Sequence, residues 1–156
     1  AMPAALGPFA RLGTTDYEAR HPGLGHSVRY LHHDRTAYAD VYVYDLGGGP
    51  VPDGVEAAAV RDQHARMLAD VVLVYRRQGR RIVAQGEVEG VAPGLRCTAF
   101  SFADAEGRPG YSLACLTGAG GQFVKVRLTG PANDEAIAAA RRFAADAVAA
   151  ARTAAR

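Results

Sequence analysis

The sequence predicts an α+β fold in which two helices pack on an antiparallel β-sheet. Short segments of alternating apolar and polar residues, typical of strands with one solvated face, recur along the chain. Glycine-rich turns join several of them, and short connections favour antiparallel neighbours. Two longer segments carry apolar residues at helical spacing. The expected element order is β-β-α-β-β-β-β-α.

The first two strands are expected at residues 26–31 and 37–45, joined by a turn at Asp34-Arg35. This turn sets a register in which apolar residues face each other on one side and opposite charges on the other. The predicted pairs are Val28 with Val41, Tyr30 with Ala39, and Arg29 with Asp40.

The first helix is expected to begin at Asp53 and to end near Gln78. Asp53 and Glu56 have the spacing of a capping box, and Gly79 is a plausible stop. The apolar stripe of this helix is formed by Val60, His64, Met67, Leu68, Val71, Val72 and Tyr75.

Four strands are expected at about 81–89, 95–103, 110–117 and 122–129, before a final helix capped by Asn133. A glycine-rich turn over residues 118–121 joins the last two strands. It predicts the pairs Tyr111 with Leu128, Leu113 with Val126, and Cys115 with Val124.

The length of 156 residues suits one domain with one core. Seven glycines and prolines before residue 26 predict an irregular lead-in over 1–25, with a turn or short strand near Tyr17, followed by a single α+β domain over 26–156. No stretch approaches the roughly 20 apolar residues of a membrane span. A secretory signal is lacking, but Ala1-Met2 resembles the remnant of a cleaved tag, so this absence is uninformative.

Nothing in the sequence indicates catalysis, a cofactor or a metal. The net charge of +2 is too weak to imply a nucleic-acid or membrane-surface partner, and an arginine cluster around residues 76–81 suits the end of a helix. The chain has no Gly-x-Ser-x-Gly elbow and no phosphate loop. Its five histidines are better explained as turn residues and, for His64, as a buried hydrogen-bonded side chain.

The two cysteines, Cys97 and Cys115, lie on strands expected to be neighbours. Pairing Ala99 with Leu113 places them directly opposite each other, within reach of a disulfide, which would imply an oxidising compartment. A shift of one residue would instead send Cys97 to the other face. Two reduced, buried cysteines remain the alternative, and we favour the bridge.

Tyr38, Tyr42 and Tyr44 alternate along the second strand beside Asp40. If a helix covers this face, they belong to the core with their hydroxyls at its rim. If none does, they form an aromatic surface suited to a ligand or a partner. The core interpretation is favoured, yet these four residues are the best candidate binding surface in the sequence.

The element order resembles that of the Mog1/PsbP-like fold. The resemblance involves residues 25–30 (GHSVRY), the middle helix, the four-strand meander and residues 123–129 (FVKVRLT). Residues 39–47 (ADVYVYDLG) are similar to a segment of uncharacterised, exported bacterial proteins. Most members of this fold bind other proteins, which the resemblance implies here at the level of fold alone. It transfers no site residues.

The leading functional hypothesis is therefore a non-enzymatic, exported bacterial protein that binds another protein or an envelope component. A periplasmic location is expected, with a cytoplasmic one left open. The alternative is a small-ligand binder with a pocket between sheet and helix near the tyrosines.

Overall fold

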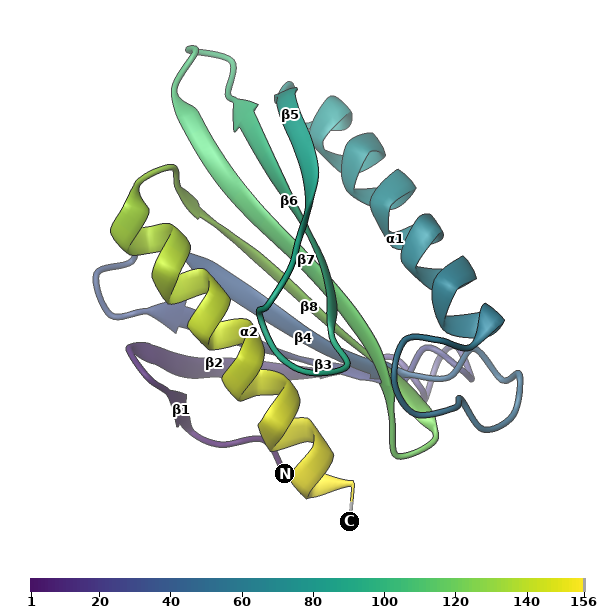
Figure 1. Cartoon of the computed structure of the whole chain (residues 1–156). Helices are drawn as coiled ribbons and strands as arrows, with labels where there is room; N and C mark the ends of the chain where they lie inside the picture. Colours follow the sequence, from purple (N-terminus) through teal and green to yellow (C-terminus); the bar gives the residue numbers. More distant parts are fainter. Residues whose placement is uncertain (156) are drawn as a thin grey trace.

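The computed structural model describes residues 1–155 and contains an eight-stranded antiparallel sheet with two helices (Figure 1). The α+β class and the two packed helices are as predicted. In chain order the elements are β1 (Ala5–Leu6), β2 (Phe9–Asp16), β3 (His26–His32), β4 (Tyr38–Tyr44), α1 (Ala58–Arg77), β5 (Arg81–Val88), β6 (Arg96–Ala103), β7 (Pro109–Ala119), β8 (Gln122–Pro131) and α2 (Asp134–Ala154).

The spatial order of the strands is β1-β2-β3-β4-β8-β7-β6-β5. After β4 the chain passes through α1 to the far edge of the sheet and returns as a meander. The last strand of the meander, β8, pairs with β4 in the middle of the sheet. This long-range pairing brings the two halves of the chain together.

The segment expected to be an irregular lead-in contains two strands instead. β2 pairs with β3 along its whole length, with a bulge between Arg11 and Gly13. The glycines and prolines form the turns around β2 rather than preventing it. In one of these turns, Glu18 accepts hydrogen bonds from the backbone N–H groups of Gly23 and Gly25. Residues 1–25 therefore extend the sheet, and two strands precede the predicted element order.

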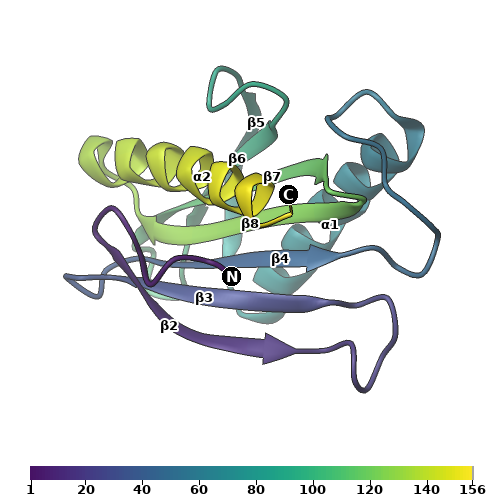
Figure 2. The same cartoon turned by 90° about the horizontal axis from the view of Figure 1, so that it is seen from below.

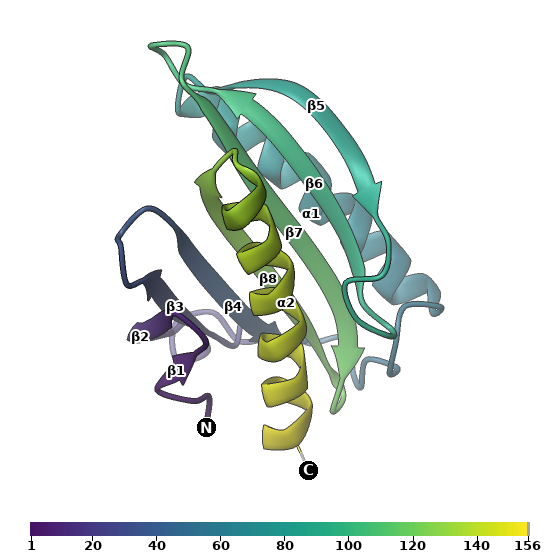
Figure 3. The ribbon, with the colours of Figure 1, turned by 60° about the vertical axis from the view of Figure 1, so that its left-hand side comes forward.

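The two helices lie on opposite faces of the sheet. Figure 3 shows α2 in front of β7 and β8 and α1 behind the strands at the far edge. Under α2 the core includes Phe143, Val41 and Leu113, and under α1 a second core includes Met67, Val71 and Phe100. Strand alternation supplies both cores, because neighbouring residues point to opposite faces.

Helix α1 begins later than predicted. Its N-cap is Ala57, which makes no side-chain capping bond, so the expected capping box is absent. Asp53 instead accepts a hydrogen bond from the N–H of Gly120, at 3.2 Å. Bridges from Val51 and Gly54 to the β7–β8 hairpin hold this segment in an extended conformation. The acidic side chain therefore stabilises a tertiary contact, not a helix end.

The β3–β4 register is as predicted, although the loop spans residues 33–36 and is longer by one residue on each side than the predicted Asp34-Arg35 turn. Val28 pairs with Val41, Tyr30 with Ala39 and Arg29 with Asp40, as predicted. The β7–β8 register was wrong by two residues, since Leu113 faces Leu128 and Cys115 faces Val126. The reason is a tight turn at Gly120-Gly121, whose φ angles of 61° and 79° suit a two-residue hairpin. A shift of two leaves every side chain on its predicted face.

Candidate functional site

Half of one sheet face is left without a helix. Helix α1 packs against β5 and β7, and Figures 1 and 3 show that it does not extend over β2 and β3. Most of the side chains of β3, β4 and β8 that point to this side lie outside the area that α1 covers. We call this surface the open sheet face, formed by Arg29, Tyr38, Asp40, Tyr42, Lys125 and Arg127.

The predicted tyrosine stripe is divided by the edge of α1. Tyr44 is 5% exposed, packs against Phe123 and accepts a hydrogen bond from Gln63 of α1 at 2.8 Å. Burial raises the pKa of Tyr44 to about 12. Tyr44 therefore belongs to the core beneath α1. Tyr38 and Tyr42 are half-buried and remain on the open sheet face.

Asp40 is held by Arg29 from the neighbouring strand. Arg29 donates from Nε to Oδ1 at 2.8 Å and from Nη2 to Oδ2 at 2.7 Å. The Asp40 side chain is 10% exposed and that of Arg29 is 52% exposed. The hydrogen bond to Asp40 raises the pKa of Arg29 above its ordinary value. Both carboxylate oxygens are thus engaged within the face.

Two cations that sequence reasoning did not select complete the open sheet face. Lys125 places Nζ 4.5 Å from the ring centroid of Tyr42 and 5.4 Å from that of Tyr44. Burial lowers the pKa of Lys125. Arg127 has a buried Nε with no hydrogen-bond partner. Both lie on the polar side of β8, but only the β4–β8 pairing places them beside the tyrosines.

The charges on the open sheet face do not balance. Three cationic side chains stand against one carboxylate, and Arg29 already pairs with it. Within residues 1–155, neither Lys125 nor Arg127 has a carboxylate within 4.0 Å. The surface combines half-buried aromatic rings with an uncompensated positive charge.

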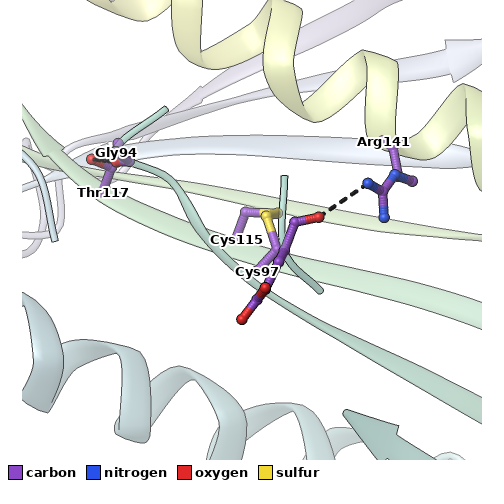
Figure 4. The surroundings of a disulfide bond; sticks show 6 residues. Gly94, Cys97, Cys115, Thr117 and Arg141 are labelled. Atoms are coloured by element: carbon purple, nitrogen blue, oxygen red, sulfur yellow. Dashed lines mark hydrogen bonds between the residues drawn. A yellow bond between two sulfur atoms is a disulfide. The ribbon is translucent and has the colours of Figure 1, made fainter. Parts of the chain in front are cut away.

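Cys97 and Cys115 are joined in a disulfide across β6 and β7, in the predicted register (Figure 4). Both are fully buried, on the α2 side of the sheet. Nearby, Thr117 donates a hydrogen bond to the Gly94 carbonyl at 2.6 Å, and Arg141 of α2 donates to the Glu89 carbonyl at 3.1 Å. The bridge thus lies where the β5–β6 loop is fastened to the rest of the molecule, and it is compatible with export.

The histidines show no metal centre among the described residues, where no group of three potential ligands occurs. His32 contacts Asp34 at 2.6 Å in the β3–β4 turn. His64 is buried, as predicted, but its Nε2 has no hydrogen-bond partner, contrary to expectation. Burial lowers the pKa of His64, so the neutral form is favoured.

A cleft of about 550 Å³ lies between the β3–β4 turn and the start of α2, with His32, Asp34, Asn133, Glu135 and Arg142 in its lining. It is on the α2 side of the sheet, so it is not the ligand pocket expected beside the tyrosines (Figure 2 shows α2 over this side). In the described part of the chain, neither helix is long and apolar enough to cross a membrane.

No protein-family model matches the sequence, and no curated protein matches it. Among solved structures, the chain is similar to the solution structure of cyanobacterial PsbP (CyanoP) from Synechocystis sp. PCC 6803. The two are 13% identical, with a TM-score of 0.49, over 86% of this chain and 79% of the other. This match supports no statement about what this protein binds.

Proposed function

We propose that this chain is a non-enzymatic, exported bacterial protein that binds a protein partner carrying acidic groups through the open sheet face. The observation that carries the proposal is the half of a sheet face that α1 leaves uncovered, which is lined by tyrosines and carries a positive charge. Tyrosine and arginine are the residues that dominate many protein interfaces.

The chemistry of the partner follows from charge complementarity. With Asp40 neutralised by Arg29, the face presents the charges of Lys125 and Arg127. A second copy of the chain that docked through the same face would bring the same positive charge against this surface and be repelled. A partner with carboxylates would be attracted, and Tyr38 and Tyr42 would supply the apolar contact area.

Site-specific crosslinking tests the proposal. Tyr42 is replaced by the photo-crosslinking amino acid p-benzoylphenylalanine, and Ala149, exposed on the outer side of α2, is replaced in a control protein. After exposure to the exported fraction of the native organism, a discrete protein adduct is expected only at position 42. The captured protein is then purified, and its affinity for Tyr42→Ala is expected to fall at least tenfold.

Two results would refute the proposal. Equal crosslinking at both positions would show that the open sheet face has no particular role. An affinity for the purified partner that Tyr42→Ala leaves unchanged would show that the contact lies elsewhere.

A further inference from the structure

A row of three charged side chains crosses the open sheet face. Asp40 of β4 lies opposite Arg29 of β3 on one side and opposite Arg127 of β8 on the other. Both oxygens of Asp40 accept hydrogen bonds from Arg29. Arg127 is therefore next to a carboxylate whose hydrogen bonds go to the other arginine.

The environment of Arg127 leaves a donor without an acceptor. Its Nε is buried and unpartnered, and its guanidinium carbon lies 6.0 Å from the centroid of the Tyr75 ring. A guanidinium carries only donors, and this Nε has no hydrogen-bond acceptor. A buried donor without an acceptor lowers stability. Because Arg127 as a whole is only half-buried, a carboxylate brought by another molecule would contact the accessible part of its guanidinium and compensate the charge of the group.

Lys125 lies two residues before Arg127 on the same side of β8. Its ammonium group is desolvated over the rings of Tyr42 and Tyr44. Asp70 of α1 influences it electrostatically but forms no ion pair with it. Side chains two residues apart on a strand are separated by about 7 Å, so two acidic residues of one segment can meet both cations.

We propose that Lys125 and Arg127 form the anchor for a segment of the partner protein that carries two acidic residues on one side. This inference rests on the proposed function and specifies its contact. The desolvated setting makes a carboxylate contact stronger than on an open surface. Because Arg29 is paired with Asp40, only two cations of this face are free to bind anions, which suits a short acidic segment better than a long polyanion such as a nucleic-acid backbone.

The anchor can be tested without knowing the partner. The probe is a peptide of alternating glutamate and alanine, and its control has glutamine in place of glutamate. Binding is followed by the amide shifts of the labelled protein at low and physiological ionic strength. The variants are Lys125→Gln and Arg127→Gln. Their matched control is Arg142→Gln, which removes one exposed arginine on α2 and changes the net charge equally.

The glutamate peptide is expected to shift residues of β4 and β8, to bind at least tenfold more weakly to Arg127→Gln, and to bind Arg142→Gln as it binds the parent. Its affinity should fall as salt is added. The amide spectrum of each variant shows whether it is folded, and Arg127→Lys, which keeps the charge, should bind better than Arg127→Gln.

Several results would overturn the anchor. They are no binding of the glutamate peptide, equal binding of the glutamine peptide, equal weakening in Arg127→Gln and Arg142→Gln, or tighter binding of a DNA oligonucleotide at the same residues. If a purified partner crosslinked at position 42 binds Arg127→Gln as tightly as the parent protein, the anchor is overturned, while the role of the open sheet face in binding stands. Peptide binding that depends on Arg127, without any captured partner, would support the anchor and count against the proposed function.

Discussion

Removing the bridge between Cys97 and Cys115 is expected to lower the free energy of unfolding by about 3 kcal/mol. The two cysteines are separated by 18 residues in the sequence. Closing a loop of that length in the unfolded chain removes conformational entropy equivalent to about 3 kcal/mol at 25 °C. The native strand pairing between β6 and β7 already holds the two positions opposite each other, so the folded state changes little.

The perturbation is the double variant Cys97→Ala/Cys115→Ala, measured by guanidinium unfolding beside the parent protein. Both side chains are fully buried, so the loss of two sulfur atoms adds a cavity contribution to the loss of the bridge. A matched experiment separates the two effects. Reductant added during unfolding should destabilise the parent by about 3 kcal/mol and leave the double variant unchanged.

Mass spectrometry of alkylated protein, with and without reductant, checks the covalent state first. Two free thiols in the non-reduced protein would show that the bridge is absent in solution. If the bridge is present but its removal lowers stability by less than about 1 kcal/mol, the loop-entropy reasoning is refuted for this hairpin.

Three further predictions concern the core and one turn. Burial lowers the pKa of His64, so its contribution to stability is present above its ordinary pKa and is lost as pH falls through the lowered value. The variant His64→Met should therefore have a urea unfolding midpoint that is less sensitive to acid than that of the parent protein. Equal sensitivity of the two proteins would contradict this prediction. Gly121→Ala should cost about 1 kcal/mol or more in a thermal melt because φ is 79°, whereas Gly48→Ala, without a positive φ, should cost less; equal losses would argue against the two-residue turn. Tyr44→Phe removes the bond from Gln63 and should cost about 1 kcal/mol in chemical unfolding, and an unchanged midpoint would show that this hydrogen bond does not stabilise the core.

The sequence predicts the strand pairings of this fold best where residues close together in the chain determine them. The Arg29–Asp40 pair was predictable because a short turn and strict alternation leave few registers. The β7–β8 register was missed by two residues because a run of glycines allows turns of different lengths. Strand β2 was missed because its bulge and flanking turns hide the alternation.

The candidate site depended on a contact that has no local signal. Tyr42 and Lys125 are paired across β4 and β8, although most of the chain lies between them. The sequence indicates that Tyr42 lies on an aromatic strand face, but it does not indicate that the strand of Lys125 is the neighbour of this strand. The sequence alone therefore does not show that cationic side chains lie beside the tyrosines.

The sequence alone determined which side chains share a face, because the two-residue period of a strand holds whatever its neighbours are. This is why Tyr38, Asp40 and Tyr42 were grouped correctly. Only the tertiary structure decided which part of that face is covered. The position of α1 depends on packing its apolar stripe against β5 to β7, and this packing buries Tyr44 while it leaves most of the open sheet face without a helix over it.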